Sequence, residues 1–187
     1  MKKIKNLKKK NGFSLIELLL VLGIIAALAI TAFMIYPKVS ASNNAQTEAT
    51  NINTIKASVT SLYSSSPDYT GLDTEVGIKS KIFPDTMVNT AGTAAVNTFK
   101  GKVTLGTSNE SPSNATDSSF TITYEDVPSA ECVKLVSAVA SNFYKITVGG
   151  ATVKAASTGT GAASGLNVTQ LSTSCATGDT EIVFTSL

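Results

Sequence analysis

The residues on either side of the bond between Gly12 and Phe13 are suited to a proteolytic cut followed by ion pairing. Before this bond, the segment MKKIKNLKKKNG carries six lysines and no acidic residue. After it, residues 13–36 contain a single side chain that is charged at neutral pH, Glu17. A lone carboxylate in lipid costs roughly 3 kcal/mol or more, so it requires a counter-charge. Cleavage after Gly12 would supply one, because it frees an ammonium group on Phe13.

The composition excludes most catalytic and metal sites. The chain has no histidine, so a Ser-His-Asp triad and a histidine-ligated zinc site are impossible. Two cysteines cannot form a four-cysteine metal site, and no glycine-rich phosphate-binding motif is present. Four acidic residues could bind calcium, namely Asp68, Asp73, Glu75 and Asp85. They lack the spacing of a calcium-binding loop, so we interpret them as part of a solvated loop. We expect no enzymatic activity and no cofactor.

Residues 13–36 have the length and composition of a membrane anchor. As a helix they would extend about 36 Å, enough for a hydrocarbon core of about 30 Å. The apolar core of a cleaved signal peptide is shorter and ends at an A-x-A-like site. Here the apolar run continues past Ala29 to Tyr36, which disfavours cleavage behind it. The lysines of the leader predict a cytoplasmic N-terminus and an exported remainder.

The net positive charge belongs to the leader. The whole chain has 15 lysines, 13 acids and a formal charge of +2. Without residues 1–12, nine lysines remain against 13 acids, which gives a side-chain charge of −4. The mature chain therefore lacks the basic balance typical of nucleic-acid binding, and we expect no specific nucleic-acid partner.

The two cysteines most simply form one disulfide in an exported domain, Cys132–Cys175. Such a bridge would close a long loop and contribute on the order of 4 kcal/mol by a loop-entropy argument. Two unrelated buried thiols are the alternative.

Residues 37–66 continue the helical pattern beyond the apolar segment. Apolar and long side chains recur at steps of three and four, which predicts an amphipathic helix. The predicted face consists of Ala45, Ala49, Ile52, Lys56, Val59 and Tyr63, widened by Ile55 and Leu62. Pro37 is expected to kink the helix or mark a change of register. We predict one helix of about 50 residues; a separate helix after Pro37 is the alternative.

The remaining residues, 67–187, predict an α+β head. Residues 67–118 look like a weakly patterned connection, and residues 157–165 like a flexible loop. A second helix should follow Pro128, with Ser129 as its N-cap and Cys132 on its inward side. The expected strands are residues 97–105, 120–124, 144–148, 151–155 and 180–185. The predicted fold is a long N-terminal helix packed on an antiparallel sheet, with one further helix and a disulfide-closed C-terminal region.

Residues 12–29, GFSLIELLLVLGIIAALA, resemble the N-terminal signature of type IV pilins and related pseudopilins. That signature is a basic leader ending in glycine, an apolar residue, a glutamate four positions on, and an unbroken apolar run. Residues 128–145, in which Cys132 heads a helix, are similar to the type IVb pilins of enteric adhesive and conjugative pili. Residues 22–24 also fit that branch.

The resemblance implies a processing and assembly route. A prepilin peptidase would cut after Gly12 and methylate the new amine of Phe13, while Glu17 would pair with the N-terminal amine of a neighbouring subunit. It further implies a helical homopolymer, which the pilus assembly machinery extracts from the bacterial inner membrane. The product would be an extracellular pilus that touches host or bacterial surfaces in adhesion, aggregation or cell–cell contact.

Two other functions remain open from the sequence. A minor pilin or a type II secretion pseudopilin would share the same N-terminal segment. A membrane protein held by a signal anchor, either an enzyme or a binding protein, belongs to a different class, and there Glu17 would be a carboxylate at the membrane surface.

Overall fold

The computed structural model describes residues 12–155 and 165–187, except for the side chain of Met34. The first 11 residues of the predicted leader lie outside the described residues. So do all but the last residue of the predicted loop 157–165.

One helix, α1 (Leu15–Leu62), runs for 48 residues and passes through Pro37. The prediction of a single long helix is therefore confirmed, and the alternative of a separate helix after Pro37 is not. The chain divides into two compact units between Val39 and Ser40. In the first unit, every side chain described between Gly12 and Val39 is exposed to solvent. The second unit, Ser40–Leu187, is a head with its own core.

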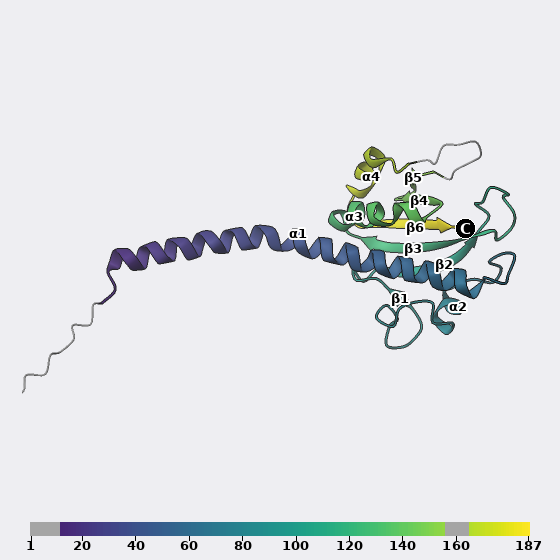
Figure 1. Cartoon of the computed structure of the whole chain (residues 1–187), viewed down its shortest axis with the longest axis horizontal. Coiled ribbons are helices and arrows are strands. Elements are labelled where there is room, and N and C mark those ends of the chain that lie inside the picture. The colour runs from purple at the N-terminus through teal and green to yellow at the C-terminus, as the bar shows by residue number, and fades with distance from the viewer. Residues whose placement is uncertain (1–11, 156–164) are drawn as a thin grey trace, which may run out of the picture. The chain divides into compact units, whose positions relative to one another are not determined.

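The head contains a six-stranded sheet in the order β1-β2-β3-β6-β4-β5 (Figure 1). Its strands are β1 (Ala95–Val96), β2 (Lys102–Ser108), β3 (Ser119–Val127), β4 (Lys145–Val148), β5 (Ala151–Lys154) and β6 (Thr180–Ser186). Every pairing is antiparallel. The last strand, β6, lies between β3 and β4, so the end of the chain joins the two hairpins into one sheet.

The helix predicted after Pro128 is present as α3 (Ser129–Val139), and the 3-10 turn η1 (Ala140–Asn142), which was not predicted, follows it. The N-cap of α3 is Pro128 rather than Ser129, which is the first helical residue. Two further helices were not predicted, α2 (Thr74–Lys79) and α4 (Val168–Cys175). Both are too short to show a helical period in the sequence.

The two short helices start because single side chains cap them. Asp73 Oδ1 accepts a hydrogen bond from Val76 N at 2.7 Å, and Asn167 Oδ1 accepts one from Gln170 N at 3.0 Å. Each cap satisfies a backbone N–H that the first helical turn leaves free. Residues 67–118 are therefore more regular than predicted, since they hold α2, β1 and β2.

The predicted strand at 97–105 is displaced along the chain, because its first residues form a turn. The side chain of Asn97 accepts hydrogen bonds from Phe99 N and Gly101 N, both at 2.9 Å. Lys100 adopts φ = 76° within this turn. Asparagine side chains that bind nearby backbone N–H groups favour turns over strands, so β2 begins only at Lys102.

The head has one hydrophobic core, between the inward face of α1 and alternate residues of the strands. Helix α1 contributes Ala45, Ala49, Ile52, Ile55 and Val59. The central strands contribute the largest buried side chains, including Phe120, Ile122, Tyr124, Ile182 and Phe184. Leu62, predicted to widen this face, is 47% exposed and lies outside the core.

Gly101 is where the turn before β2 meets the end of β3. A Cβ atom at this position would lie 1.9 Å from the carbonyl oxygen of Glu125. The side chain of Asn97 fixes the same carbonyl by donating from Nδ2 to it at 2.7 Å. Only glycine allows this approach of backbone to backbone.

We predict that Gly101→Ala lowers the free energy of unfolding by about 3 kcal/mol, because the turn must move away from β3. The matched control is Gly106→Ala, whose Cβ would lie 3.4 Å from Thr121 Oγ1 and should cost less than about 1 kcal/mol. Denaturant unfolding of the purified chain measures both. Equal losses in the two variants would contradict the prediction.

Candidate processing and assembly site

The bond between Gly12 and Phe13 lies in non-helical backbone just before α1. Residues 12–14 have no regular secondary structure, and the first helical hydrogen bond runs from Leu18 N to the Ser14 carbonyl at 3.1 Å. Phe13 is 86% exposed. Exposed backbone outside regular structure is the kind that a peptidase can bind and cut. A side chain added at Gly12 would meet no atom within 4 Å, so the glycine is not required by packing.

Glu17 lies in the first turn of α1. A negative charge there interacts favourably with the partial positive charge at the start of a helix. Its side chain makes no hydrogen bond or ion pair with any residue in the ranges 12–155 and 165–187. The carboxylate is thus available to a cation from another molecule.

The helical residues around Glu17 form a continuous apolar surface. Large exposed side chains on it include Leu15, Ile16, Leu18, Leu19, Leu20, Leu22, Ile24, Ile25, Leu28, Ile30, Phe33 and Ile35. Among the described residues, α1 is the one helix that is long and apolar enough to cross a membrane. A surface this apolar requires lipid or protein around it.

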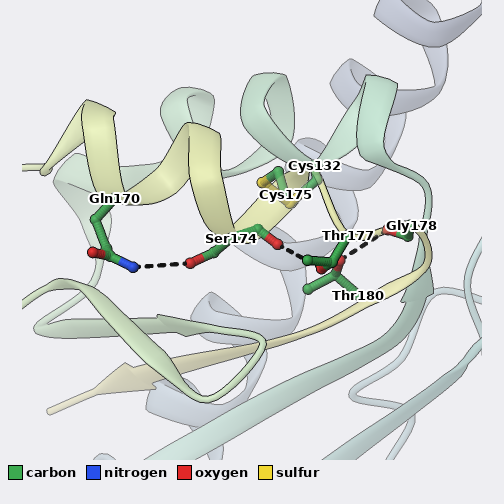
Figure 2. The surroundings of a disulfide bond; sticks show 7 residues. All are labelled: Cys132, Gln170, Ser174, Cys175, Thr177, Gly178 and Thr180. Atoms are coloured by element: carbon green, nitrogen blue, oxygen red, sulfur yellow. Dashed lines mark hydrogen bonds between the residues drawn. A yellow bond between two sulfur atoms is a disulfide. The ribbon is translucent and has the colours of Figure 1, made fainter.

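The predicted disulfide is present in the head and joins Cys132 to Cys175 with a Cα–Cα distance of 5.7 Å. Cys132 lies in the first half of α3 and Cys175 is the last residue of α4 (Figure 2). Both side chains are buried. The bridge therefore ties the C-terminal region to the core through α3.

Side-chain hydrogen bonds lie within α4 and in the segment that follows the disulfide (Figure 2). Gln170 Nε2 donates to Ser174 Oγ at 3.3 Å, and Thr177 Oγ1 donates to the Ser174 carbonyl at 3.1 Å. Thr180 Oγ1 donates to the Gly178 carbonyl at 2.9 Å. These bonds hold the short connection that leads from α4 into β6.

Two lysines satisfy the carbonyl groups at the end of α3 and η1. Lys154 Nζ donates to Ala140 O at 2.6 Å and to Phe143 O at 2.5 Å, and Lys56 Nζ donates to Asn142 O. Cations are favourable at the C-terminal end of a helix. Burial, followed by the nearby charge of Lys154, lowers the pKa of Lys56, and burial lowers the pKa of Lys154. These contacts join α1 and β5 to η1 and the residue that follows it.

Two of the four acids considered for calcium, Asp73 and Glu75, have other roles. Asp73 caps α2, and Glu75 forms an exposed ion pair with Lys79 at 2.5 Å. No group of three or more potential metal ligands occurs in the part of the chain that the structure describes. The interpretation of these acids as a solvated loop has to be corrected for Asp73 and Glu75, which belong to a capped helix.

Sequence reasoning missed one acid with a structural role, Glu48. It lies three residues after Ala45 and four before Ile52, on the inward face of α1, and it is fully buried. The spacing alone could have revealed it, because a charged residue in an apolar stripe needs a partner.

We predict that the double variant Cys132→Ala/Cys175→Ala lowers the free energy of unfolding by about 2–4 kcal/mol, since the unfolded chain gains freedom. Alanine is used because the site is buried. Denaturant unfolding is the measurement, and the reduced native chain should lose a similar amount. Ser172→Ala, an exposed change in α4, should stay within about 0.5 kcal/mol. A loss no larger than that of Ser172→Ala would refute the role of the bridge.

Two known protein families match the chain, one at its N-terminus and one over most of the remainder. Residues 7–33 match the family described as the prokaryotic N-terminal methylation motif. Residues 42–187 match the family described as PilS N terminal.

The chain is also similar to the major structural subunit of bundle-forming pilus from Escherichia coli O127:H6 (strain E2348/69 / EPEC). The two are 29% identical over 133 residues, which cover 71% of this chain and 67% of the relative. The protein of the same description from Escherichia coli O111:H- gives the same values.

Two solved structures share the fold. TcpA, a type IV pilin from the Vibrio cholerae El Tor biotype, aligns with a TM-score of 0.56 at 18% identity, covering 78% of this chain and 99% of that one. A type IVb pilin from Salmonella typhi aligns with a TM-score of 0.53 at 18% identity, covering 74% and 97%. With the methylation motif at the N-terminus and the PilS N terminal family over most of the remainder, this chain belongs to the type IV pilins, and it is IVb-like.

Proposed function

We propose that this pilin is the major structural subunit of a type IV pilus. It is made with a leader, cut after Gly12, N-methylated at Phe13 by a prepilin peptidase, and polymerised through the apolar part of α1. The observation that carries the proposal is the exposed apolar part of α1, residues 15–36, whose single carboxylate, Glu17, is paired by no described side chain. The match to the methylation motif and the similarity to a major pilus subunit support it.

Cleavage after Gly12 creates the positive counter-charge that Glu17 lacks. Methylation leaves the amine of Phe13 as a secondary ammonium, so the positive charge remains. Once subunits pack together and water is excluded, each ammonium pairs with the carboxylate of a neighbour. Breaking a buried ion pair costs about 3–5 kcal/mol. Subunits are therefore held at the one axial offset that pairs every charge.

The apolar part of α1 has two environments in this scheme. Before assembly it lies in the inner membrane, with the lysine-rich leader in the cytoplasm and the head exported. During assembly the pilus machinery moves it into the filament, where neighbouring helices replace lipid. This exchange brings little net hydrophobic gain, so the energy for extraction comes from the machinery.

Four segments follow from this proposal. Residues 1–12 are the leader, 13–36 the membrane and filament-core helix, 37–66 its amphipathic continuation, and 67–187 the globular head. The division of the structure into compact units between Val39 and Ser40 lies close to the second boundary. Because residues 45–59 contribute to the head core, the amphipathic continuation folds with the head.

The assembled protein is an extracellular pilus on the bacterial surface, and its role is contact rather than catalysis. We propose that its partners are other copies of itself and host or bacterial surfaces, in adhesion, aggregation or cell–cell contact. The serine-rich segment 108–119 would contact these surfaces. Most of its residues from 112 to 118 are exposed, which fits that role.

We predict that filaments sheared from cells contain a chain that starts at Phe13 and carries one additional methyl group, as measured by mass spectrometry. The variant Gly12→Val should remain uncut, because the bulky side chain obstructs the peptidase. Since a side chain at Gly12 meets no atom within 4 Å, the head of this variant should keep its disulfide and its stability. A mature chain that starts elsewhere, or normal cutting of Gly12→Val, would contradict the processing route.

We predict that Glu17→Ala abolishes filaments, or reduces their yield at least tenfold, while cleavage and membrane insertion continue. A loss of about 3–5 kcal/mol per subunit contact would lower assembly by at least that factor. Electron microscopy and the mass of sheared filaments provide the measurement. The control is Glu75→Ala on the exposed face of α2, which removes an ion pair worth less than about 1 kcal/mol. A simple anchored protein would tolerate both changes equally.

A further inference from the structure

Glu48 occupies a core position of α1 in the head. The inward face of the helix runs through Ala45, Ile52, Ile55 and Val59, and Glu48 lies between the first two at helical spacing. It is 0% exposed, although the residues around it on this face are apolar. Charged residues are rarely fully buried, so a charged residue in such a stripe requires a structural reason.

The carboxylate of Glu48 has specific neutral partners. Its Oε1 accepts hydrogen bonds from Thr98 N at 2.7 Å and from the Thr98 hydroxyl, and its Oε2 accepts one from Asn51 Nδ2 at 3.2 Å. No described lysine forms an ion pair with it. The hydroxyl of Tyr124 is buried with no hydrogen bond, and its pKa is raised first by burial and then by the charge of Glu48.

Stability alone does not explain this arrangement. A buried charge loses its hydration, and the hydrogen bonds from Thr98 and Asn51 offset part of that cost. A lone buried polar group can, however, select one packing among several, because it finds hydrogen-bond partners in only one of them. A single asparagine at a core position of a coiled coil acts in this way. Glu48 has its donors in one arrangement of α1 on the sheet and loses them in others.

At the start of the head the apolar stripe distinguishes these arrangements weakly, whereas further along a slide of four residues would bring Glu48 or Lys56 to the buried position of Ile52. Ala41, Ala45 and Ala49 are spaced by four residues and are all buried. Sliding α1 by four residues, about 6 Å, would place alanine where alanine was at this end of the head. The same slide would remove Glu48 from Thr98 and bury its carboxylate without a donor.

We propose that Glu48 is a positioning residue that fixes the axial and rotational register of α1 against the sheet. Because a helical polymer requires every copy to present the same surface, one register per subunit is a condition for one filament symmetry. This inference rests on the proposed function for its consequence in the filament, while its consequence in the monomer can be observed separately.

The test compares three variants of the full chain in detergent and in sheared filaments. Glu48→Leu removes all acceptors at similar volume, Glu48→Gln keeps one oxygen that can accept from Thr98 N–H, and Thr98→Val removes only the hydroxyl donor. For each, thermal unfolding gives stability, two-dimensional NMR counts the head conformations, and cryo-electron microscopy gives filament rise and twist.

We expect Glu48→Leu to remain folded, to melt within about 5 °C of the native chain, and to be cut and oxidised normally. It should nevertheless show more than one set of head resonances, and a filament yield at least tenfold lower or filaments of mixed symmetry. Glu48→Gln should restore one set of resonances and native symmetry. A single set of resonances together with native symmetry in Glu48→Leu would overturn the inference.

Two further outcomes are distinguishable. If Glu48→Leu does not fold, Thr98→Val decides, with doubled resonances at near-native stability as the supporting result and a single set as the opposing one. If the native chain forms no filaments, the proposed function fails, and the resonances of the monomer alone decide whether Glu48 fixes the register.

Discussion

A carboxylate removed from water must have a partner, and α1 carries two that meet this constraint in different ways. Glu48 finds its partners within the head, at Thr98 and Asn51. Glu17 finds none in the part of the chain that the structure describes. The first is therefore satisfied by folding, whereas the second is, under the proposed function, satisfied by the N-terminal amine of another subunit. One helix thus links a folding constraint in the head to an assembly constraint near its start.

The head folds around a core that its own residues supply. Every buried residue of the hydrophobic cluster belongs to Ser40–Leu187, from Ala45 to Phe184. The disulfide and the two lysines that satisfy the end of η1 complete this unit. The apolar residues before Ser40 contribute nothing to that core, so they remain free for lipid or for other subunits. Separating the two surfaces lets the same chain be a stable domain and a polymer building block.

The sequence predicts the elements whose signal extends over many residues. The apolar stripe of α1, the alternation in β3 and the glycine pair between β4 and β5 all led to correct elements. Elements that depend on one side chain were missed or displaced, namely α2, α4 and the turn that Asn97 holds. The candidate site at Gly12 and Glu17 is proposed from residue types and spacing, whereas the hydrogen-bond partners of Glu48 can be identified only when the helix is packed on the sheet.

Salt weakens some of the electrostatic interactions within a filament of this kind more than others. The mature chain carries an excess of acids, so heads repel one another, but at physiological salt such interactions decay over about 8 Å. In the proposed filament, an ion pair between Phe13 and Glu17 in a dry helical core would be screened far less, because no mobile ions would reach it. Contacts between heads can then vary with salt while the axial offset of the subunits stays fixed. Under the proposed function, the register of the polymer therefore depends on the one charge pair that salt in the solvent does not weaken.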